Sequence, residues 1–209
     1  PRLEEVIELA RRTNSGLYIE LKAAEAAEPT WQILQEQDFR FAAIGSFHTG
    51  CIAKLRQSKC SYPLSVLVPI GADPFDYSSV AQPDIIHLCW KSASAAPHQL
   101  VTSEILERCH QQGIALVTWD EERLEVLRGL AHLPILGICS DCPEILKPWQ
   151  TGADGLPQVV CHRGANFVAP ENTLIAASIC ISQGFDIVEV DVRTTADGEI
   201  VLIHDATVD

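Results

Sequence analysis

The chain alternates between helix-like and strand-like patterns of hydrophobic residues. Leu3, Val6, Ile7 and Ala10 recur at helical spacing, so an amphipathic helix is expected at the start. Residues 16–22 then form a short apolar run with a two-residue period. This period places Tyr18, Glu20 and Lys22 on one face of a predicted strand, with Leu17, Ile19 and Leu21 on the other.

The same alternation continues along the rest of the chain. Further strands are predicted at 41–47, 64–69, 84–90, 114–119 and 135–141, with helices at 29–37, 49–58, 120–131 and 143–149. Another helix is expected from an N-cap at Ser103 to a stop at Gly113. After 151–157, a Gly- and Pro-containing segment interpreted as a linker, come a strand at 158–162, a helix capped by Asn172 or Thr173 and ending at Gly184, a strand at 185–193, and a hairpin run at 199–204.

Short Val/Ile/Leu strands that are each followed by a helix are typical of a parallel sheet covered on both faces. Six principal strands precede the segment 151–157 and two follow it, if 199–204 counts as an extension of the strand before it. Eight such strands favour an α/β fold, a (β/α)8 TIM barrel. An open doubly wound sheet is the weaker alternative, because the sequence has no Gly-rich phosphate loop.

Charge and composition restrict the classes of molecule that the protein is expected to bind. The 209 residues carry a net charge of −13, with 47% hydrophobic residues. Residues 151–209 hold only two Lys/Arg against nine Asp/Glu. This acidity argues against nucleic-acid binding, and the sequence has no apolar run of the roughly 18 residues that a membrane span needs. The eight scattered cysteines are interpreted as reduced and buried, Cys139 and Cys142 included, which favours a cytoplasmic protein.

Several residues suited to metal-assisted chemistry fall at predicted strand ends, where a (β/α)8 barrel places its active site. His162 and Arg163 end one strand, Glu189 and Asp191 share a face of the next, and Glu20 occupies a similar position on an earlier strand. Three carboxylates suit Ca²⁺ or Mg²⁺. Two histidines nearby, His162 and His204, could act as general acid and base, and Arg163 could bind phosphate oxygens.

Plainer interpretations exist for each of these residues. His87 lies in an apolar run and is expected to be a core residue, whereas His48, His98, His110 and His132 are expected at the surface or in loops. Glu20 could simply pair with Lys22, and two acidic residues on one strand face could be solvated. The coincidence of several such residues at strand ends favours a functional site.

The same residues resemble a known family. His162-Arg-Gly164, Pro170-Glu-Asn-Thr173, Asp186-Ile-Val-Glu-Val-Asp-Val192, Thr195-Ala-Asp-Gly198 and His204-Asp205 resemble, in order and spacing, the opening half of glycerophosphodiester phosphodiesterases, within the TIM-barrel superfamily of phosphodiesterases that resemble phosphatidylinositol phospholipase C. The first part of the chain resembles the closing half of that family through Pro1–Val6, Ile19–Lys22, Ser46-Phe47, Trp119 and Asp141-Cys-Pro143.

The resemblance implies specific roles. Glu189, Asp191 and Glu20 would hold a divalent cation, Ca²⁺ or Mg²⁺, and His162 and His204 would form the acid/base pair. Arg163 would bind phosphate. Of the other site residues, Glu171 and Asn172 would line or brace the site, and Lys22 and Trp119 would face the substrate. The implied reaction is hydrolysis of a small-molecule glycerophosphodiester to glycerol 3-phosphate and an alcohol, with water or the substrate's own hydroxyl as the attacking group.

The family's halves occur here in swapped order. Residues 1–150 are expected to be the C-terminal part of such a domain, with the closing six strands, and residues 158–209 the N-terminal part, with the opening two. The family pattern continues past the position of Asp209, so a segment of a tandem protein is favoured over a circular permutant. Alternative functions are a related phosphodiesterase that acts on lysophospholipids and a non-catalytic module that binds a cation or phosphate. The oligomeric state stays open.

Overall fold

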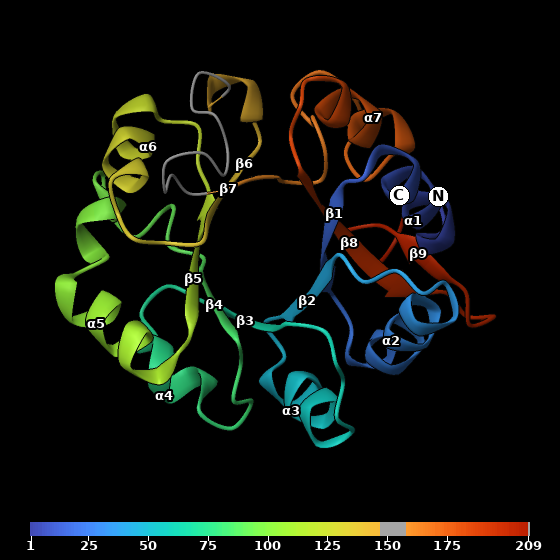
Figure 1. The fold of residues 1–209 in the computed structure, drawn as a ribbon, viewed down its shortest axis with the longest axis horizontal. Helices are drawn as coiled ribbons and strands as arrows, with labels where there is room; N and C mark the ends of the chain where they lie inside the picture. Colours follow the sequence, from blue (N-terminus) through green and yellow to red (C-terminus); the bar gives the residue numbers. More distant parts are fainter. Residues whose placement is uncertain (147–157, 209) are drawn as a thin grey trace.

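The strands form one closed parallel barrel in the computed structural model, which describes residues 1–146 and 158–208. Neighbouring strands pair in chain order from β1 to β8, and β1 pairs with β8 to complete the ring, as Figure 1 shows from along the barrel. The strands are β1 (Gly16–Leu21), β2 (Ala42–Ser46), β3 (Leu64–Val68), β4 (Ile85–Leu88), β5 (Ala115–Asp120), β6 (Gly137–Ser140), β7 (Gln158–Cys161) and β8 (Ile187–Thr194). The predicted (β/α)8 barrel is therefore confirmed, and the open sheet is not the fold.

Helices surround the barrel on the outside (Figure 1). They are α1 (Leu3–Thr13), α2 (Ala27–Glu36), α3 (Thr49–Gln57), α4 (Pro74–Ser78), α5 (Ser103–Gln112), α6 (Leu124–Ala131) and α7 (Leu174–Ser182), with short 3₁₀ turns η1 (Ala24–Ala26), η2 (Pro97–Leu100) and η3 (Pro143–Leu146). The hairpin strand β9 (Ile200–Leu202) pairs antiparallel with β8, as the sequence predicted. The predicted linker 151–157 and residues 147–149 of the predicted helix 143–149 lie outside the described residues.

Local differences from the sequence prediction have identifiable causes. Thr102, and not Ser103, caps α5, because its side-chain oxygen accepts from the Ile105 amide. Thr173 caps α7 in the same way, which leaves the side chain of Asn172 available for another contact. The short helix α4 was not predicted, although Asp73 caps it and a proline opens it.

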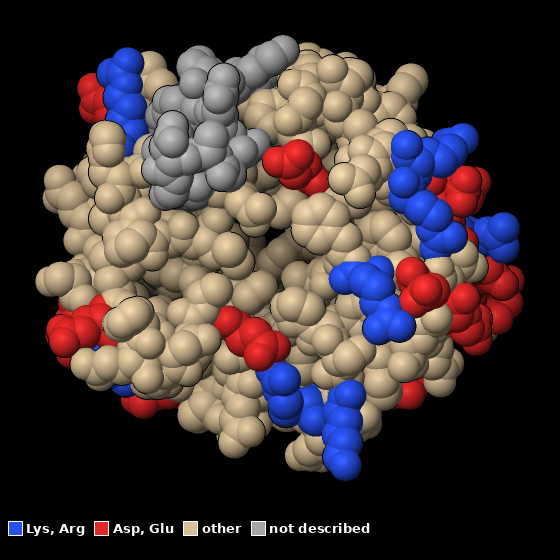
Figure 2. Space-filling view, viewed as in Figure 1, with Lys and Arg blue, Asp and Glu red and all other residues tan. Residues whose placement is uncertain are grey.

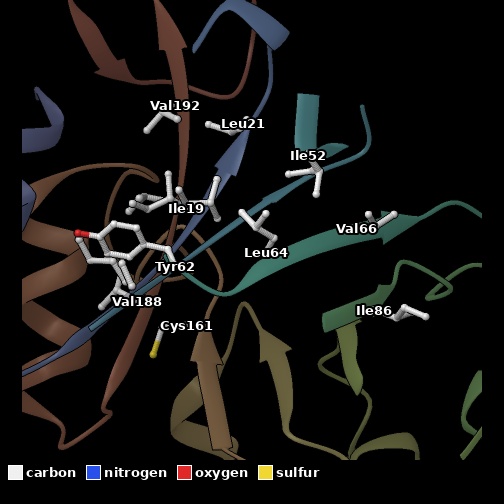
Figure 3. Packing of buried hydrophobic residues seen from close by; sticks show 14 of the residues in the cluster. Ile19, Leu21, Ile52, Tyr62, Leu64, Val66, Ile86, Cys161, Val188 and Val192 are labelled. Carbon is white, nitrogen blue, oxygen red and sulfur yellow. The ribbon is translucent and has the colours of Figure 1, made fainter. Parts of the chain in front are cut away.

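The two-residue period of β1 divides its side chains between two environments. Ile19 and Leu21 face the helices and pack in the main hydrophobic core, where Leu21 lies beside Val192 of β8 (Figure 3). Tyr18 faces the barrel interior, where it packs with Leu67, Cys139 and Val160. Glu20 follows Tyr18 on the same inner face, so the strand pattern carries a carboxylate to the carboxyl end of the barrel.

The interior of the barrel is tightly filled near its middle. A side chain at Gly45 of β2 would meet the Tyr18 hydroxyl at 2.8 Å and a Leu67 methyl group at 2.9 Å, so a larger residue there would have to displace these buried side chains. The Tyr18 hydroxyl donates to Ser65 Oγ at 2.6 Å and lies 3.1 Å from His87 Nδ1. Tyr18, Ser65 and His87 thus form a buried polar cluster inside the barrel. His87 is a buried core residue, as the sequence predicted.

The surface indicates less about function than the barrel interior does. The face drawn in Figure 2 is hollowed at its centre, and its charged side chains lie mostly away from that hollow. Within the described residues, no helix is long and apolar enough to cross a membrane.

Candidate active site

Three buried carboxylates meet at the carboxyl ends of β1 and β8. Glu189 and Asp191 are two residues apart on β8, so both side chains lie on its inner face. Glu20 of β1 is paired with Asp191 in the strand register. One oxygen atom from each of the three lies within 4.8 Å of the others. The structure thus brings together the three residues that the sequence proposed as cation ligands.

Two basic side chains approach this cluster. Lys22 Nζ lies 2.5 Å from Glu20 Oε1 and 3.1 Å from Asp191 Oδ1. Arg163 Nε lies 3.0 Å from Asp191 Oδ2. When all three carboxylates are ionised, they and the basic groups of Lys22 and Arg163 leave one negative charge within a buried cluster.

The cluster fits a divalent cation. Glu189 Oε1 is buried and has no hydrogen-bond partner among the described residues, which is costly for a carboxylate unless a cation supplies the missing contact. Burial, together with the charge of Asp191, raises the pKa of Glu189 to about 8. An all-oxygen ligand set of this kind suits Ca²⁺ or Mg²⁺. A divalent cation would change the cluster's net charge to +1, which matches the single negative charge of a phosphodiester.

The loop after β7 positions Arg163 through an unusual backbone. Arg163 has φ 56° and Gly164 has φ 83°, both in the left-handed region. A side chain at Gly164 would meet the backbone of Ala176 at 2.7 Å, so the loop packs directly against α7. This path lets the Arg163 amide donate to Glu189 Oε2 at 2.9 Å, while its guanidinium reaches Asp191.

The predicted bracing residues lie beside this loop. The Asn172 side chain is buried and bonds Asp191 twice, because Nδ2 donates to the carboxylate at 2.9 Å and Oδ1 accepts from the backbone amide at 3.0 Å. Glu171 is exposed and accepts from Arg163 at 2.8 Å. Asn172 therefore contacts a proposed metal ligand, and Glu171 contacts the proposed phosphate ligand.

The two predicted histidines each pair with a carboxylate. His162 follows β7, and its Nδ1 lies 2.5 Å from Asp141 Oδ1. His204 follows β9, is partly exposed and pairs with Asp205 at 2.7 Å, while its backbone oxygen accepts from Arg193. Both line one cavity of about 250 Å³, as do Arg163, Lys22 and Glu189. The two imidazoles, the basic groups of Arg163 and Lys22 and the Glu189 carboxylate therefore line the same cavity.

Trp119 of β5 also lines this cavity but is almost fully buried. Its indole N–H donates to Glu121 Oε2 at 3.0 Å, and the Arg123 guanidinium donates to the same oxygen at 2.6 Å. Only part of the Trp119 ring is therefore available to a substrate.

The opposite end of the barrel has different chemistry. A cavity of about 210 Å³ at the amino ends of the strands is lined mainly by apolar side chains such as Leu17 and Val160, with Arg40 as the charged residue in its described lining. It has no carboxylate or histidine in that lining. The candidate active site therefore lies at the carboxyl ends of the strands, where barrels of this type carry theirs.

Sequence reasoning missed two residues of the site, Asp141 and Glu121. Asp141 follows the end of β6, so the rule that placed His162 and Arg163 at a strand end could also have identified it. Glu121 follows the end of β5 and is fully buried, but nothing in the sequence pattern distinguishes it from Asp120 or Glu122.

Sequence comparison matches part of the chain to known proteins. The model of the "Glycerophosphoryl diester phosphodiesterase family" matches residues 162–209. A glycerophosphodiester phosphodiesterase of Caldanaerobacter subterraneus is 47% identical over 51 residues, which is 24% of this chain and 21% of that one. Glycerophosphodiester phosphodiesterase 1 of Bos taurus is 50% identical over 66 residues, 32% and 18% of the two chains. The matched part thus spans about a fifth of these relatives' length.

Solved structures show the likeness in fold. A glycerophosphodiester phosphodiesterase from Parabacteroides distasonis superposes with a TM-score of 0.56 at 17% identity, covering 69% of this chain and 61% of that one. A fructose-bisphosphate aldolase from Campylobacter jejuni gives 0.60 at 11% identity, covering 90% and 74%. These identities establish the barrel alone. The sequence matches go further for one segment, because the part of the chain that matches the glycerophosphoryl diester phosphodiesterase family model contains His162, Arg163, Glu189, Asp191 and His204.

Proposed function

We propose that the protein hydrolyses glycerophosphodiesters to glycerol 3-phosphate and an alcohol, with Ca²⁺ or Mg²⁺ bound by Glu20, Glu189 and Asp191. The observation that carries this proposal is the unpaired, buried Glu189 Oε1 in a three-carboxylate cluster that lines the same cavity as Arg163 and two histidines. The family match of residues 162–209 supports it. Such a reaction belongs to phospholipid and glycerol metabolism.

The residues of the chain divide the work by their chemistry. Arg163 and Lys22 offer cationic N–H donors to the non-bridging phosphate oxygens, where negative charge builds up during the reaction. The buried pairings of Arg163 with Asp191 and of Lys22 with Glu20 hold both donors in place before the substrate arrives. A bound divalent cation would add Lewis-acid polarisation of the phosphate.

His162 and His204 are the proposed acid/base pair. The attacking oxygen, from water or from the glycerol hydroxyl, must lose a proton, and the leaving alcohol must gain one. Two imidazoles in one cavity can divide these transfers between them, and each contributes typically about 10²–10⁴-fold in rate. Trp119 would contribute the exposed part of its ring to one wall of the cavity.

We also propose how the chain divides into parts of a domain. Residues 1–150 are assigned to the C-terminal part of a phosphodiesterase domain and residues 158–209 to the N-terminal part. The closed ring of β1 to β8 is compatible both with a segment of a tandem protein and with a natural permutant.

The test is an assay for glycerol 3-phosphate release from glycerophosphocholine with and without EDTA. Release that EDTA abolishes and added Ca²⁺ or Mg²⁺ restores would support the proposal. Turnover that persists unchanged in EDTA would contradict the metal assignment. A parallel assay with lysophosphatidylcholine separates the lysophospholipid alternative, and calorimetric cation binding without turnover of either substrate would favour a non-catalytic module.

A further inference from the structure

We propose that Asp120 is a specificity-determining residue that binds a positively charged head group, so that the preferred substrates are glycerophosphodiesters of choline or ethanolamine. The inference rests on the proposed function and deepens it, because it names the class of alcohol that the phosphate carries besides glycerol. Asp120 is the last residue of β5 and lies outside residues 162–209, which the family model matches.

An irregularity in β5 turns Asp120 into the barrel. Val117 of β5 lines the cavity at the amino ends, so in a regular strand Trp119 would also face inward and Asp120 would face the helices. The pairing of β5 with β6 shifts its register between Thr118 and Asp120, so that Asp120 is paired with Cys139. Trp119, Asp120 and Cys139 all line the active-site cavity. Irregularities of this kind are common beside active sites, where they redirect a side chain.

Asp120 lies across the ring from the proposed cation site. Glu20 is on β1 and Glu189 is on β8, whereas β5 lies on the other side of the barrel (Figure 1). Glu20, Glu189 and Asp120 nevertheless line the same cavity. A substrate that spans the cavity from the cation site therefore meets Asp120 at its other end.

The surroundings of Asp120 keep a net negative charge. Lys91 Nζ lies 2.9 Å from Asp120 Oδ2 and 2.7 Å from Glu122 Oε2. When all three groups are ionised, two carboxylates and one ammonium leave one negative charge. The Asp120 side chain is 31% exposed, so it is open to a ligand, whereas the three carboxylates of the cation site are buried.

The two ends of the cavity therefore differ in the sign of their charge. With a divalent cation bound, the end at Glu189 is positive and suits the phosphate, and the end at Asp120 is negative and suits an ammonium group. Diesters of choline and ethanolamine carry both charges, whereas diesters of glycerol or inositol have a neutral head group. Phe47 is half-buried and lines the same cavity, where it offers an aromatic surface to a trimethylammonium group.

The test uses two substrates that differ only in charge. One is glycerophosphocholine, and the other is its neutral isostere, in which a carbon atom replaces the choline nitrogen. We expect the unmodified protein to prefer glycerophosphocholine in kcat/KM by about fivefold, the upper range for a partly exposed ion pair. Asp120→Asn keeps the shape of the side chain but removes its charge, so the two kcat/KM values should become nearly equal.

Lys91→Met should act in the opposite direction. Loss of the ammonium group leaves Asp120 and Glu122 without their shared partner, so this end of the cavity becomes more negative and the preference for glycerophosphocholine should increase. Damage to the site would instead lower the hydrolysis of both substrates in the same proportion. Asp120→Glu should retain most of the preference, because it retains the charge.

Asp76→Asn is the matched control. Asp76 is exposed on α4 and is not among the described residues that line the cavity, so its replacement should leave the preference unchanged. Thermal unfolding checks that each variant folds. Inhibition of the unmodified protein by choline and by the neutral isostere of choline tests the inference without any substitution, and choline should be the stronger inhibitor.

Equal kcat/KM values for the two substrates in the unmodified protein would overturn the inference, as would a preference that Asp120→Asn retains. Both outcomes leave the proposed function intact, because the substrates are still hydrolysed. A second equivalent of Ca²⁺ that binds the unmodified protein but not Asp120→Asn would assign Asp120, with Asp141 and His162, to a metal ion instead. A protein that hydrolyses neither substrate would overturn the proposed function and this inference together.

Discussion

Glu20 and Asp191 face each other across the seam that closes the barrel. They occupy the same register position of β1 and β8, and the ammonium group of Lys22 lies between their carboxylates. β1 belongs to the first part of the chain and β8 to the last, so the seam and the proposed cation site coincide. The charged groups that would bind the cation are therefore also expected to affect the stability of the β1–β8 pairing.

Lys22→Met should destabilise the fold. Lys22 is 12% exposed on its side chain, and its loss would leave Glu20 and Asp191 as uncompensated neighbours. Breaking a buried ion pair by removing one partner costs about 3–5 kcal/mol. We expect a decrease of roughly this size in the free energy of unfolding, measured by urea denaturation in EDTA at pH 7. Lys54→Met, on the exposed face of α3, is the matched control, and equal stability of the two variants would show that Lys22 does not hold the seam.

Divalent cations should stabilise the protein through Glu189. A ligand at about 100 times its Kd adds about 2.7 kcal/mol to the stability of the folded state. For a chain of this size each kcal/mol raises Tm by about 2–4 °C. Ca²⁺ or Mg²⁺ should therefore raise Tm by several degrees in a scanning calorimeter.

Glu189→Gln should remove most of this increase, because it neutralises the carboxylate whose Oε1 lacks a partner. Glu36→Gln, at the exposed end of α2, should keep the full increase. A cation effect that is equal in both variants would place the binding site elsewhere.

His87 should make the fold sensitive to acid. Burial, with the charges of His162 and Lys22, lowers the pKa of His87 to about 3, whereas an unfolded histidine has a pKa of about 6.5. The unfolded chain therefore binds a proton that the folded chain excludes, so stability is complete above about pH 6.5 and declines as the pH falls towards 3. At pH 4.5 the loss is about 3 kcal/mol.

His87→Gln removes this titration, and its stability should fall less between pH 7 and pH 4.5 than that of the unmodified protein, even if its stability at pH 7 is lower. Urea denaturation at several pH values measures the difference. His110→Gln, on the exposed side of α5, serves as the control. Parallel curves for the His87→Gln variant and the unmodified protein would assign the acid sensitivity to other groups.

Much of the barrel and the site follows from local pattern. The strand period predicted how the residues of β1 divide between its two faces, and the strand-end rule identified His162, Arg163 and Glu20 as candidate site residues. These signals are readable because parallel strands must bury both faces and because barrel chemistry gathers at one end.

The contacts within the site could not be predicted in this way. Asn172 was expected as a possible helix cap and, from the family resemblance, as a residue that lines or braces the site, but the bond of its side chain to Asp191, 19 positions away in the sequence, was not predicted. Asp141 pairs with His162 across two strands, and only the register of β6 with β7 reveals this. Such pairings depend on how strands align in space, which one sequence does not specify. The helix α4 was missed because five residues are too few for a helical period to appear.

The pairing of β1 with β8 within one chain predicts a compact monomer in solution. If β1 and β8 of one chain pair as the structure shows, each molecule is one compact barrel. A compact chain of 209 residues has a radius of gyration of about 17 Å. Small-angle scattering should give this value, with a forward-scattering mass close to 22.9 kDa that does not change with concentration. Two separated lobes would give a clearly larger radius at the same mass. Two chains that complete each other's barrels would instead double the mass, and Lys22→Met, which weakens the pairing of β1 with β8, should then shift the monomer–dimer balance.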